Sequence, residues 1–353
     1  MSLFEGKRIL LISPQEWDHI PVSKHHYAKE LVQLGATVYF LEPPTHSGFR
    51  QKLVTRKIEG NLNAIRISLP GIGRLKFHIP SLYFFFLEKG IKRLNRMLGP
   101  FDFIWNFDNG HYFKWPGKFG DAIKIFHPVD KVNSFWNIQD YDIVFSVSEE
   151  ILNSVNHTRK YFVQHGLSRD FTNIQTDFTS NNQESGRRVG YVGNILHPSF
   201  NLNCFKRLTS DLPQVEFNIW GTSGHSGSDI DEIKNQENVT IHGVLTGKDL
   251  FNNLRQMDAL LLMYKESTIY KMDNSHKLIE YLSTGRPVIS TPLSYYKNSD
   301  LFSQSMEYVQ YKQHLLDALD MDPGYTNMKG VEYALDNTYA KQIQRIEKCL
   351  LDL

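Results

Sequence analysis

Several residues between Ser275 and Pro287 have types and spacing that suit binding of a charged ligand. A helix beginning near Ser275 presents free backbone N–H groups and the positive end of its dipole, and Lys277 adds a charge beside them. These groups suit a pyrophosphate. Glu280, one turn deeper, is placed to accept hydrogen bonds from two ribose hydroxyls, and Gly285 ends the helix. The spacing therefore predicts a nucleotide site, and the alternative is an ordinary amphipathic helix followed by a Gly-x-Pro turn.

Short apolar runs alternate with amphipathic stretches along the chain, a pattern typical of parallel sheets built from βαβ units. The first unit is predicted as a strand over residues 7–13, a helix over 22–34 that Gly35 stops, and a strand over 37–41. Further strands are predicted at residues 64–69, 101–107, 122–126, 142–147, 160–164, 188–192, 215–220, 239–243, 259–264, 287–290 and 308–310.

The length of 353 residues and this pattern predict an α/β protein with two Rossmann-like, doubly wound domains that face a cleft. The first domain is expected over residues 1–170, a polar linker over 171–187, and the second domain over 188–335. A final helix within 336–353 carries Ile343, Ile346 and Leu350 on one stripe. We expect this helix to pack on one of the two domains, and it is a candidate to cross back to the first.

Functional residues are expected in the loops that follow the strands, because open α/β sheets bind ligands at the carboxyl ends of their strands. His127 and Asp130 follow one predicted strand and are candidates for functional residues in such a loop. Alternatively, His127 merely closes the strand and Asp130 is a turn residue. Asp18 and His25 are further candidates, although an aspartate in a loop and an exposed histidine on a helix are common features of surfaces.

Residues 276–291 resemble the donor-site motif of retaining GT-B glycosyltransferases of the large family-four group, Lys-x-x-Glu-Tyr-Leu-x-x-Gly-x-Pro-Val, at every fixed position. The resemblance implies a hexosyltransferase that moves a sugar from a UDP- or GDP-sugar to a glycan or lipid-linked acceptor, with retention of configuration. A weaker likeness in the first half, at residues 17–18, 25–26 and 41–44, resembles a branch that builds bacterial exopolysaccharide or cell-wall polymers.

The resemblance also implies roles for other parts of the second half. Residues 190–194 look like the Gly-rich turn at which the backbone approaches the diphosphate, and 220–221 and 242–243 look like the loops that hold the nucleobase. The donor-binding residues expected on this basis are Gly193, Asn194, Gly221, Gly243, Asp273, Ser275, His276, Lys277 and Glu280. The expected catalytic residues are His127, Asp130 and Glu280, with Asp18 and His25 on the acceptor side.

The chain departs from the family pattern at two places. Many members carry Glu-x7-Glu, whereas the residue eight places before Glu280 is Met272, with Asp273 one place later. Many members also place an Arg and a Lys shortly after the Gly-rich turn, whereas the next bases here are Lys206 and Arg207. The residues at the start of the predicted donor helix would then neutralise the diphosphate without that basic pair.

A retaining transfer without a covalent intermediate requires that the leaving diphosphate be stabilised and the acceptor hydroxyl be held on the same face of the sugar. No metal is expected, because the histidines of the sequence lack the spacing of metal ligands, such as His-Glu-x-x-His. No cofactor is expected either, since the nucleotide-sugar is a substrate. A nicotinamide dehydrogenase fits poorly, because residues 13–17 lack a Gly-x-Gly-x-x-Gly turn. Two alternatives stay open: a catalytically silent GT-B homologue that binds sugar or scaffolds a partner, and a GT-B sugar-nucleotide epimerase.

Charge and composition limit the partners and the compartment. The 39 Lys and Arg residues against 38 Asp and Glu leave a net charge of +1, which argues against nucleic acid. The two cysteines, Cys204 and Cys349, are too few for a disulfide framework and indicate a reducing compartment. The chain enters its first strand without the apolar region of a signal peptide, so a cytoplasmic location is expected.

Residues 81–98 combine a run of aromatic side chains with four basic residues. The apolar part, residues 82–87, is far shorter than the roughly 20 residues that span a bilayer. One hypothesis is an interfacial helix at the inner membrane face that reaches a lipid-linked acceptor. The alternative is a core helix with a solvated basic face.

Overall fold

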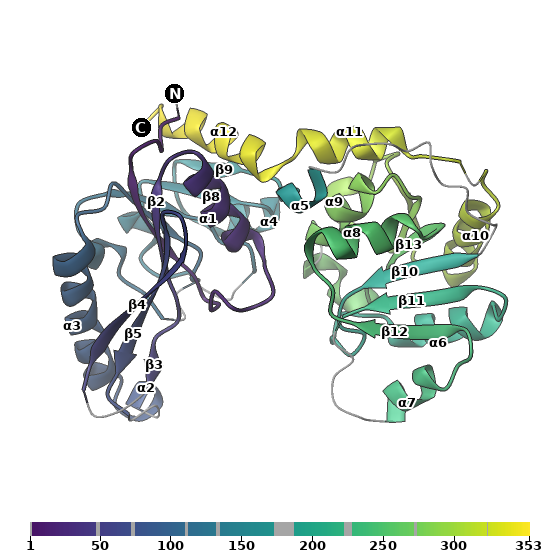
Figure 1. The fold of residues 1–353 in the computed structure, drawn as a ribbon, viewed down its shortest axis with the longest axis horizontal. Helices are drawn as coiled ribbons and strands as arrows, with labels where there is room; N and C mark the ends of the chain where they lie inside the picture. Colours follow the sequence, from purple (N-terminus) through teal and green to yellow (C-terminus); the bar gives the residue numbers. More distant parts are fainter. Residues whose placement is uncertain are drawn as a thin grey trace. The chain divides into compact units, whose positions relative to one another are not determined.

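The computed structural model describes residues 2–46, 50–71, 75–109, 112–131, 135–172, 187–221, 228–271, 274–322 and 324–353. The chain forms two compact units (Figure 1). Unit 1 consists of Met1–Gln164 and Gln342–Leu353, and unit 2 consists of His165–Lys341. The linker predicted over 171–187 lies almost entirely outside the described residues.

Unit 1 is built on one sheet with the strand order β3-β5-β2-β1-β6-β7-β8-β9, in which neighbouring strands are parallel, and β4 adds to β5 in the antiparallel sense. The strands are β1 (Arg8–Ile12), β2 (Thr37–Leu41), β3 (Thr45–His46), β4 (Lys52–Glu59), β5 (Leu62–Leu69), β6 (Phe103–Asn106), β7 (Ile123–Phe126), β8 (Ile143–Ser146) and β9 (Lys160–Phe162). The α-helices are α1 (Ser23–Gln33), α2 (Leu75–His78), α3 (Pro80–Leu98) and α4 (Glu149–Ser154), and α12 (Tyr339–Leu350) enters the unit at Gln342.

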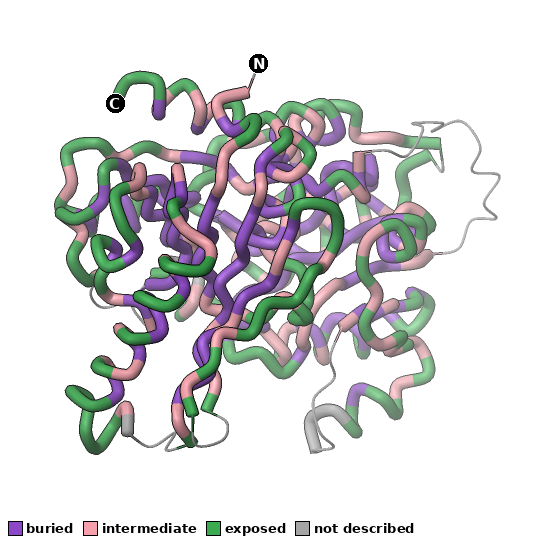
Figure 2. The backbone as a smooth tube through the Cα atoms, turned by 60° about the vertical axis from the view of Figure 1, so that its left-hand side comes forward, coloured by how far each residue is buried: buried purple, intermediate pink, exposed green. Residues whose placement is uncertain are grey.

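The central strands of unit 1 form because they are continuous apolar runs that can be covered on both faces. β1 has the sequence RILLI, and its residues 9–12 are completely buried. It pairs in register with β2 on one side and β6 on the other. Figure 2 shows these strands as continuous buried stretches in the middle of the sheet. The predicted strands of this region are confirmed, and Gly35, at φ 89°, supplies the left-handed residue that ends the turn after α1.

Unit 2 is built on a wholly parallel sheet with the strand order β12-β11-β10-β13-β14-β15. The strands are β10 (Arg188–Val192), β11 (Glu216–Trp220), β12 (Val239–Gly243), β13 (Ala259–Leu262), β14 (Val288–Ser290) and β15 (Ser303–Gln304). The α-helices are α5 (Arg169–Thr172), α6 (Leu202–Asp211), α7 (Ser228–Lys234), α8 (Gly247–Arg255), α9 (His276–Ser283), α10 (Tyr308–Leu319) and α11 (Met328–Asp336).

Two apolar cores cover the two faces of this sheet. β13 shows how, because successive side chains of a strand point to opposite faces. Leu260 and Leu262 pack in the core that includes α8, α9 and Ala334 of α11. Ala259 and Leu261 pack in the core that includes α6 and α10. A central parallel strand with both faces covered must be apolar throughout, which is why the sequence pattern identified it.

The structure corrects one predicted strand and confirms one predicted stripe. The strand predicted over 308–310 is wrong, because these residues form the first turn of α10. The buried residues Tyr311, Leu315 and Ala318 that follow have helical spacing, which overrides the local β propensity. In α12, Ile343 and Ile346 are completely buried and Leu350 nearly so, as predicted. Within the described residues, no helix combines the length and the apolar composition that a bilayer crossing requires.

Candidate nucleotide-binding site

Three glycines with positive φ lie at the carboxyl ends of neighbouring strands of unit 2. Gly193 (φ 144°) follows β10, Gly221 (φ 153°) follows β11, and Gly243 (φ 81°) is the last residue of β12. The N–H of Gly193 donates to Trp220 O at 2.8 Å, and the N–H of Gly221 donates to Gly243 O at 2.7 Å. A Cβ on Gly221 would lie 2.2 Å from Gly193 O. This edge is therefore bare backbone that a ligand can approach closely.

Two tyrosines hold α9 against this edge. The Val192 N–H, at the end of β10, donates to the Tyr281 hydroxyl at 2.7 Å. The side chain of Ser275, the residue before α9, shares a buried hydrogen bond of 2.8 Å with the Tyr264 hydroxyl. Neither tyrosine was among the predicted site residues. The amino end of α9 is thus fixed beside the carboxyl end of β10, where its free N–H groups are available to an anion.

Lys277, in the first turn of α9, extends its ammonium group to Gly193. A Cβ on Gly193 would lie 2.5 Å from Lys277 Nζ, and the same Nζ lies 5.1 Å from the centroid of the Tyr191 ring. Burial lowers the pKa of the Lys277 ammonium to about 8, and the charge of Glu280 partly opposes this shift. Within the part of the chain that the structure describes, no hydrogen bond or ion pair engages this ammonium. A partly buried cation that no carboxylate pairs favours the arrival of an anion.

Glu280 lies one turn deeper on α9, with its side chain only 15% exposed. Burial raises the pKa of this carboxyl group, while His276 and then Lys277 act to lower it. His276 Nδ1 lies 3.6 Å from Glu280 Oε1. None of the described residues donates a hydrogen bond to this carboxylate. Its oxygens are therefore available to hydroxyl donors of a ligand.

The segment at residues 165–167 lies beside the start of α9. The predictions did not include it in the site. The His165 and His276 rings meet edge to face with centroids 5.4 Å apart. Gly166 packs closely against Tyr339, because a Cβ there would lie 2.4 Å from Tyr339 Cγ. Leu167 N–H donates to Asn337 O at 2.7 Å, which ties the segment to the start of α12. The signal in the sequence was the place of these residues directly after the strand predicted at 160–164, where functional loops are expected.

The residues expected near a nucleobase form a second group at this edge. The Trp220 and His242 rings stack with centroids 5.0 Å apart and planes at 13°. His242 Nε2 lies 2.8 Å from Asn218 Oδ1. Trp220 Nε1 is buried, and no acceptor of the described chain reaches it. The side chain of Asn194, which was predicted to bind the donor, stabilises the turn that it belongs to. Its Oδ1 accepts a hydrogen bond from the Leu196 N–H at 2.9 Å.

Further expectations concern unit 2. Met272 and Asp273, at and after the position of the family's first acid, both lie outside the described residues. The predicted site residues that the structure brings together on unit 2 are Gly193, Gly221, Gly243, Ser275, His276, Lys277 and Glu280. His, Cys, Asp and Glu residues of the described chain form no group of three that could hold a metal ion.

His127, a predicted catalytic residue of unit 1, lies inside an aromatic cluster with no exposed surface. Its ring stacks on Phe107 at 4.8 Å, and Trp105 Nε1 donates to its Nδ1 at 3.3 Å. Burial lowers the pKa of His127 to about 3, with a further contribution from Lys24. The neutral ring must therefore carry its hydrogen on Nε2, which finds no acceptor among the described residues. Contact with a substrate would require neighbouring rings to move.

The other candidates of unit 1 have identifiable structural partners. His25 is 1% exposed, unlike the exposed histidine considered from the sequence. Its Nδ1 accepts from the Val22 N–H at 3.2 Å and its Nε2 donates to Glu16 O at 3.1 Å, so it caps α1. Asp18 is exposed and binds Arg56 through both carboxylate oxygens, at 3.2 and 2.8 Å. The catalytic and acceptor roles of these residues stay predictions.

Lys24 and Asp130 mark the carboxyl edge of the unit 1 sheet. Asp130 is exposed, and its carbonyl oxygen accepts from Asn109 Nδ2 at 3.1 Å. Lys24, only 2% exposed, was not predicted. Burial lowers the pKa of its ammonium to about 8, against the charges of Asp130 and Asp108. Its place in the first turn of the helix that follows β1 was the signal that could have identified it.

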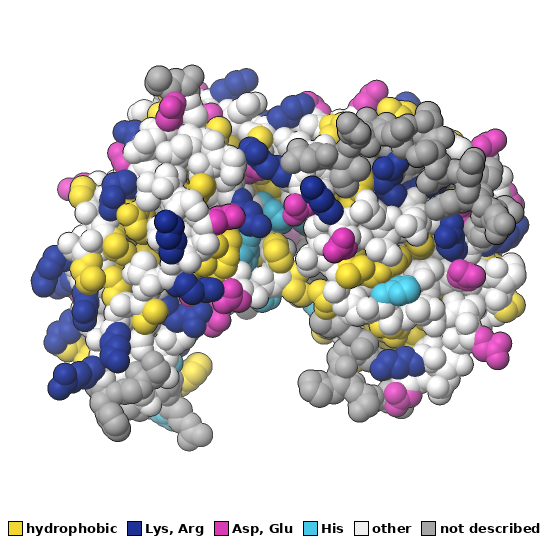
Figure 3. Space-filling model, viewed as in Figure 1, with side chains coloured by type: hydrophobic (Ala, Val, Ile, Leu, Met, Phe, Trp, Pro, Cys, Tyr) yellow, Lys and Arg dark blue, Asp and Glu magenta, His cyan; other side chains and the backbone are white. Residues whose placement is uncertain are grey.

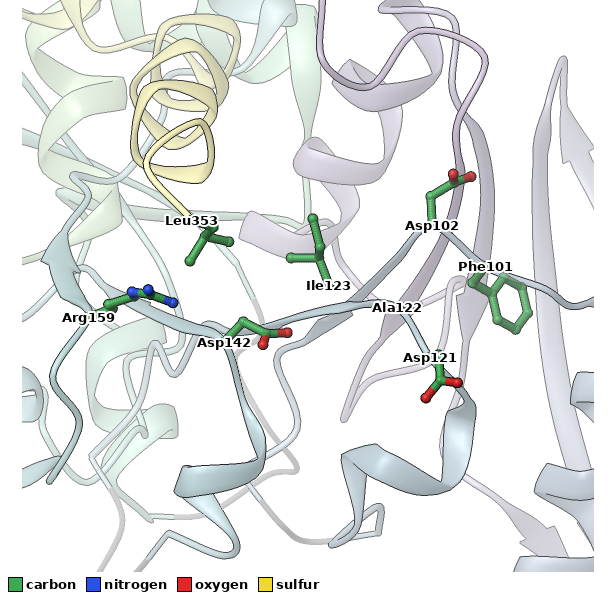
Figure 4. Close-up of a pocket in the computed structure, with 8 residues that line it drawn as sticks. All are labelled: Phe101, Asp102, Asp121, Ala122, Ile123, Asp142, Arg159 and Leu353. Atoms are coloured by element: carbon green, nitrogen blue, oxygen red, sulfur yellow. The ribbon is translucent and has the colours of Figure 1, made fainter.

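A cavity of about 510 Å³ lies at the other edge of the unit 1 sheet (Figure 4). Asp102, Ile123 and Asp142 line it, and each lies at or directly before the first residue of β6, β7 or β8. Asp102 is engaged with Lys7 Nζ at 3.1 Å and the Arg8 N–H at 2.8 Å. Because open α/β sheets bind ligands at the carboxyl ends of their strands, we do not assign the site to this cavity.

Gly221→Ala is expected to lower the free energy of unfolding by at least about 2 kcal/mol, because the new Cβ would meet Gly193 O at a positive φ. Urea unfolding measures the change. Gly117→Ala is the matched control, since nothing lies within 4 Å of a Cβ there, and it should change stability by less than about 0.5 kcal/mol. Equal effects of the two substitutions would contradict the crowding argument.

His127→Phe is expected to flatten the loss of stability in acid. The buried ring stays neutral in the folded protein down to about pH 3, whereas in the unfolded chain it gains a proton below about pH 6.5. The wild type therefore loses stability as pH falls from 6.5, by up to about 1.4 kcal/mol per pH unit from this residue. Urea unfolding between pH 4.5 and 7.5 should show a smaller slope in the variant. Phe145→Leu, a change without titration in the same cluster, should lower stability and keep the wild-type slope.

Comparison with known proteins gives matches among solved structures only. No protein-family model matches the chain, and no curated protein sequence matches it. The chain is similar to sucrose-phosphate synthase from Thermosynechococcus elongatus, with a TM-score of 0.71 at 13% identity, over 98% of this chain and 99% of that one. It is also similar to a trehalose-6-phosphate structure from E. coli bound with UDP-2-fluoro glucose, with a TM-score of 0.69 at 11% identity, over 98% and 99%.

A third match is an α,α-trehalose-phosphate synthase (UDP-forming) from Burkholderia xenovorans in complex with glucose-6-phosphate. Its TM-score is 0.70 at 11% identity, and the match covers 98% of this chain and 100% of that one. At such low identity these likenesses show the fold alone. The chain has the α/β fold with two parallel, Rossmann-like sheets that GT-B glycosyltransferases share.

Proposed function

We propose that this chain is a glycosyltransferase that transfers a sugar from a UDP- or GDP-sugar to a glycan or lipid-linked acceptor, with retention of configuration. The observation that carries the proposal is the Lys277 ammonium, which has no hydrogen-bond or ion-pair partner among the described residues and lies beside the bare backbone of Gly193. It stands at the amino end of a helix, with the Glu280 carboxylate one turn deeper. This order of groups fits a diphosphate followed by a ribose.

The chemistry follows from what such a site can stabilise. As the bond between the sugar C1 and the diphosphate oxygen breaks, negative charge grows on the leaving group. Lys277 and the N–H groups at the start of α9 offset that charge. The acceptor oxygen forms the new bond on the same face of the sugar, and its proton passes to the departing phosphate oxygen. This step needs no nucleophile from the protein, which fits the neutral, enclosed state of His127.

One feature supports the choice of the donor, and another supports the choice of the cellular compartment. One solved structure with this fold holds a UDP-sugar analogue and another is of a UDP-forming enzyme, so UDP-sugars are the first donors to test. The two cysteines are free, as expected for a reducing compartment, and we propose a cytoplasmic enzyme. A role in bacterial polysaccharide biosynthesis rests on the sequence likeness of the first half alone.

The decisive experiment incubates the chain with a panel of UDP- and GDP-sugars and measures release of free nucleotide and of new glycan. Nucleotide release with transfer to an added acceptor supports the proposal. Nucleotide binding without any release would favour the silent homologue. Conversion of one sugar nucleotide into another without an acceptor would favour the epimerase. Absence of nucleotide binding would refute a donor site on unit 2.

Glu280→Ala is expected to abolish transfer and to weaken nucleotide binding by roughly tenfold to a hundredfold, since two hydrogen bonds to a charged acceptor are lost. Calorimetric titration with UDP and GDP measures the affinity, and an unchanged unfolding midpoint shows that the fold is intact. Glu216→Ala, at the amino end of β11, is the matched control and should behave as wild type. Near-normal affinity in Glu280→Ala would contradict the assignment of the ribose to this carboxylate.

Nucleoside diphosphate affinity is expected to fall as pH rises above about 8, because Lys277 then loses the charge that attracts the diphosphate. Above that pH the dissociation constant should increase by up to about tenfold per pH unit. Titrations between pH 7 and 9.5 test this. Lys277→Met should bind weakly and independently of pH over that range, and Lys277→Arg should keep its affinity at pH 9.5. A wild-type pH profile that Lys277→Met reproduces would show that another group is responsible.

A further inference from the structure

Unit 1 exposes large apolar side chains around α2 and the start of α3. Phe77 is 80% exposed, Phe85 52%, Ile79 48% and Leu82 36%. They occur within nine residues of the chain, at the end of α2 and the first half of α3. We call them the apolar tip of α3. Large exposed apolar side chains grouped so closely along the chain are typical of a surface that another molecule covers.

These side chains do not belong to the core stripe of the helix. The inner face of α3 is supplied by Tyr83, Leu87, Ile91 and Leu94, all buried against the sheet. Of the aromatic run considered from the sequence, Tyr83 faces inward and Phe85 outward. α3 is thus a core helix, which was one of the two alternatives considered from the sequence. Its outer surface carries further apolar side chains that do not take part in core packing.

The outer face of α3 beyond the apolar tip is basic. It carries Lys89, Lys92, Arg93 and Arg96, all exposed. The only acid within α3 is Glu88, which pairs with Lys92 at 3.2 Å and with Lys118 at 3.1 Å. In the described structure no ion pair engages the other three bases. Figure 3 shows the dark blue basic side chains gathered over α3, at the left edge of the molecule, with yellow apolar side chains among them.

Aromatic side chains from two loops continue this surface. The Trp115 ring meets Phe84 of α3 edge to face at 4.8 Å. Lys114 Nζ lies 3.8 Å from the centroid of the Trp136 ring and 5.3 Å from that of Phe84. Trp115 is 38% and Trp136 49% exposed. Tryptophan and lysine together are typical of the boundary between water and lipid, where each side chain keeps a polar end in contact with water.

We infer that this face of unit 1, made of the apolar tip, the four bases of α3 and the Trp115 and Trp136 side chains, binds the surface of a membrane that contains anionic phospholipid. The apolar tip would enter the boundary between head groups and acyl chains, and the bases would contact lipid phosphates. A second copy of the chain fits this face less well. Two like faces in a symmetric dimer would bring their bases together, and the core of a protein interface is usually depleted of charge.

The test is flotation of the full chain with vesicles of phosphatidylcholine alone and of phosphatidylcholine with 30% phosphatidylglycerol. The wild type is expected to float with the anionic vesicles and much less with the neutral ones, and 0.5 M NaCl should weaken its binding. Phe77→Ser with Phe85→Ser should reduce partitioning at least about tenfold, since two exposed aromatic rings are removed. Lys89→Glu with Arg93→Glu should do the same for anionic vesicles.

Matched controls distinguish binding through this face from nonspecific binding of the protein to vesicles. Val309→Ser removes an exposed apolar side chain of unit 2, and Lys297→Glu reverses an exposed charge there, so both should float as wild type. Equal flotation with both vesicle types, or equal flotation of the wild type and the face variants, would overturn the inference. So would a dimer in sedimentation velocity that the face variants abolish, or binding to nucleic acid or a polysaccharide in place of vesicles. The outcome is independent of nucleotide binding on unit 2.

Discussion

Crowding of the backbone at the carboxyl edge of the unit 2 sheet determines what can lie there. The carbonyl oxygen of Gly193 occupies the space that a side chain on Gly221 would need, and the Lys277 ammonium occupies the space that a side chain on Gly193 would need. The strand ends are thus linked to one another and to the start of α9 by contacts that leave no room for a side chain. The same crowding partly buries a positive charge that has no ion-pair partner among the described residues, which makes the site favourable for an anion.

α9 can hold functional groups in place because most of its surface is used for packing. Leu278, Ile279 and Leu282 are buried in the core, and the Tyr281 hydroxyl binds the end of β10. The helix therefore cannot rotate without loss of core contacts. Its free end presents charge and N–H groups in one direction. A site on regular elements of this kind is more exactly positioned than one on loops, and it needs little reorganisation when a charged ligand arrives.

Unit 1 uses the corresponding edge differently. The histidines there are enclosed by aromatic rings, and burial lowers the pKa of His25 to about 4, so both His25 and His127 are neutral near pH 7. The residues predicted from the first half are thus partly structural, because His25 caps α1 and Asp18 pairs with Arg56. What distinguishes unit 1 is the outer surface of α3, where apolar and basic side chains are exposed beyond the needs of its core.

Sequence reasoning identified the central strands of both units and the groups at the start of α9, and it missed the strands β3, β4 and β15. Buried parallel strands must be continuous apolar runs, and Lys277 and Glu280 share a helix, so their spacing fixes their relation. It failed at residues 308–310, where local β propensity yielded to helical packing. The enclosure of His127, the burial of Lys24 and the contact between His165 and His276 could be seen only in the folded structure. These facts depend on contacts between segments distant along the chain, and neither composition nor spacing records which of them meet.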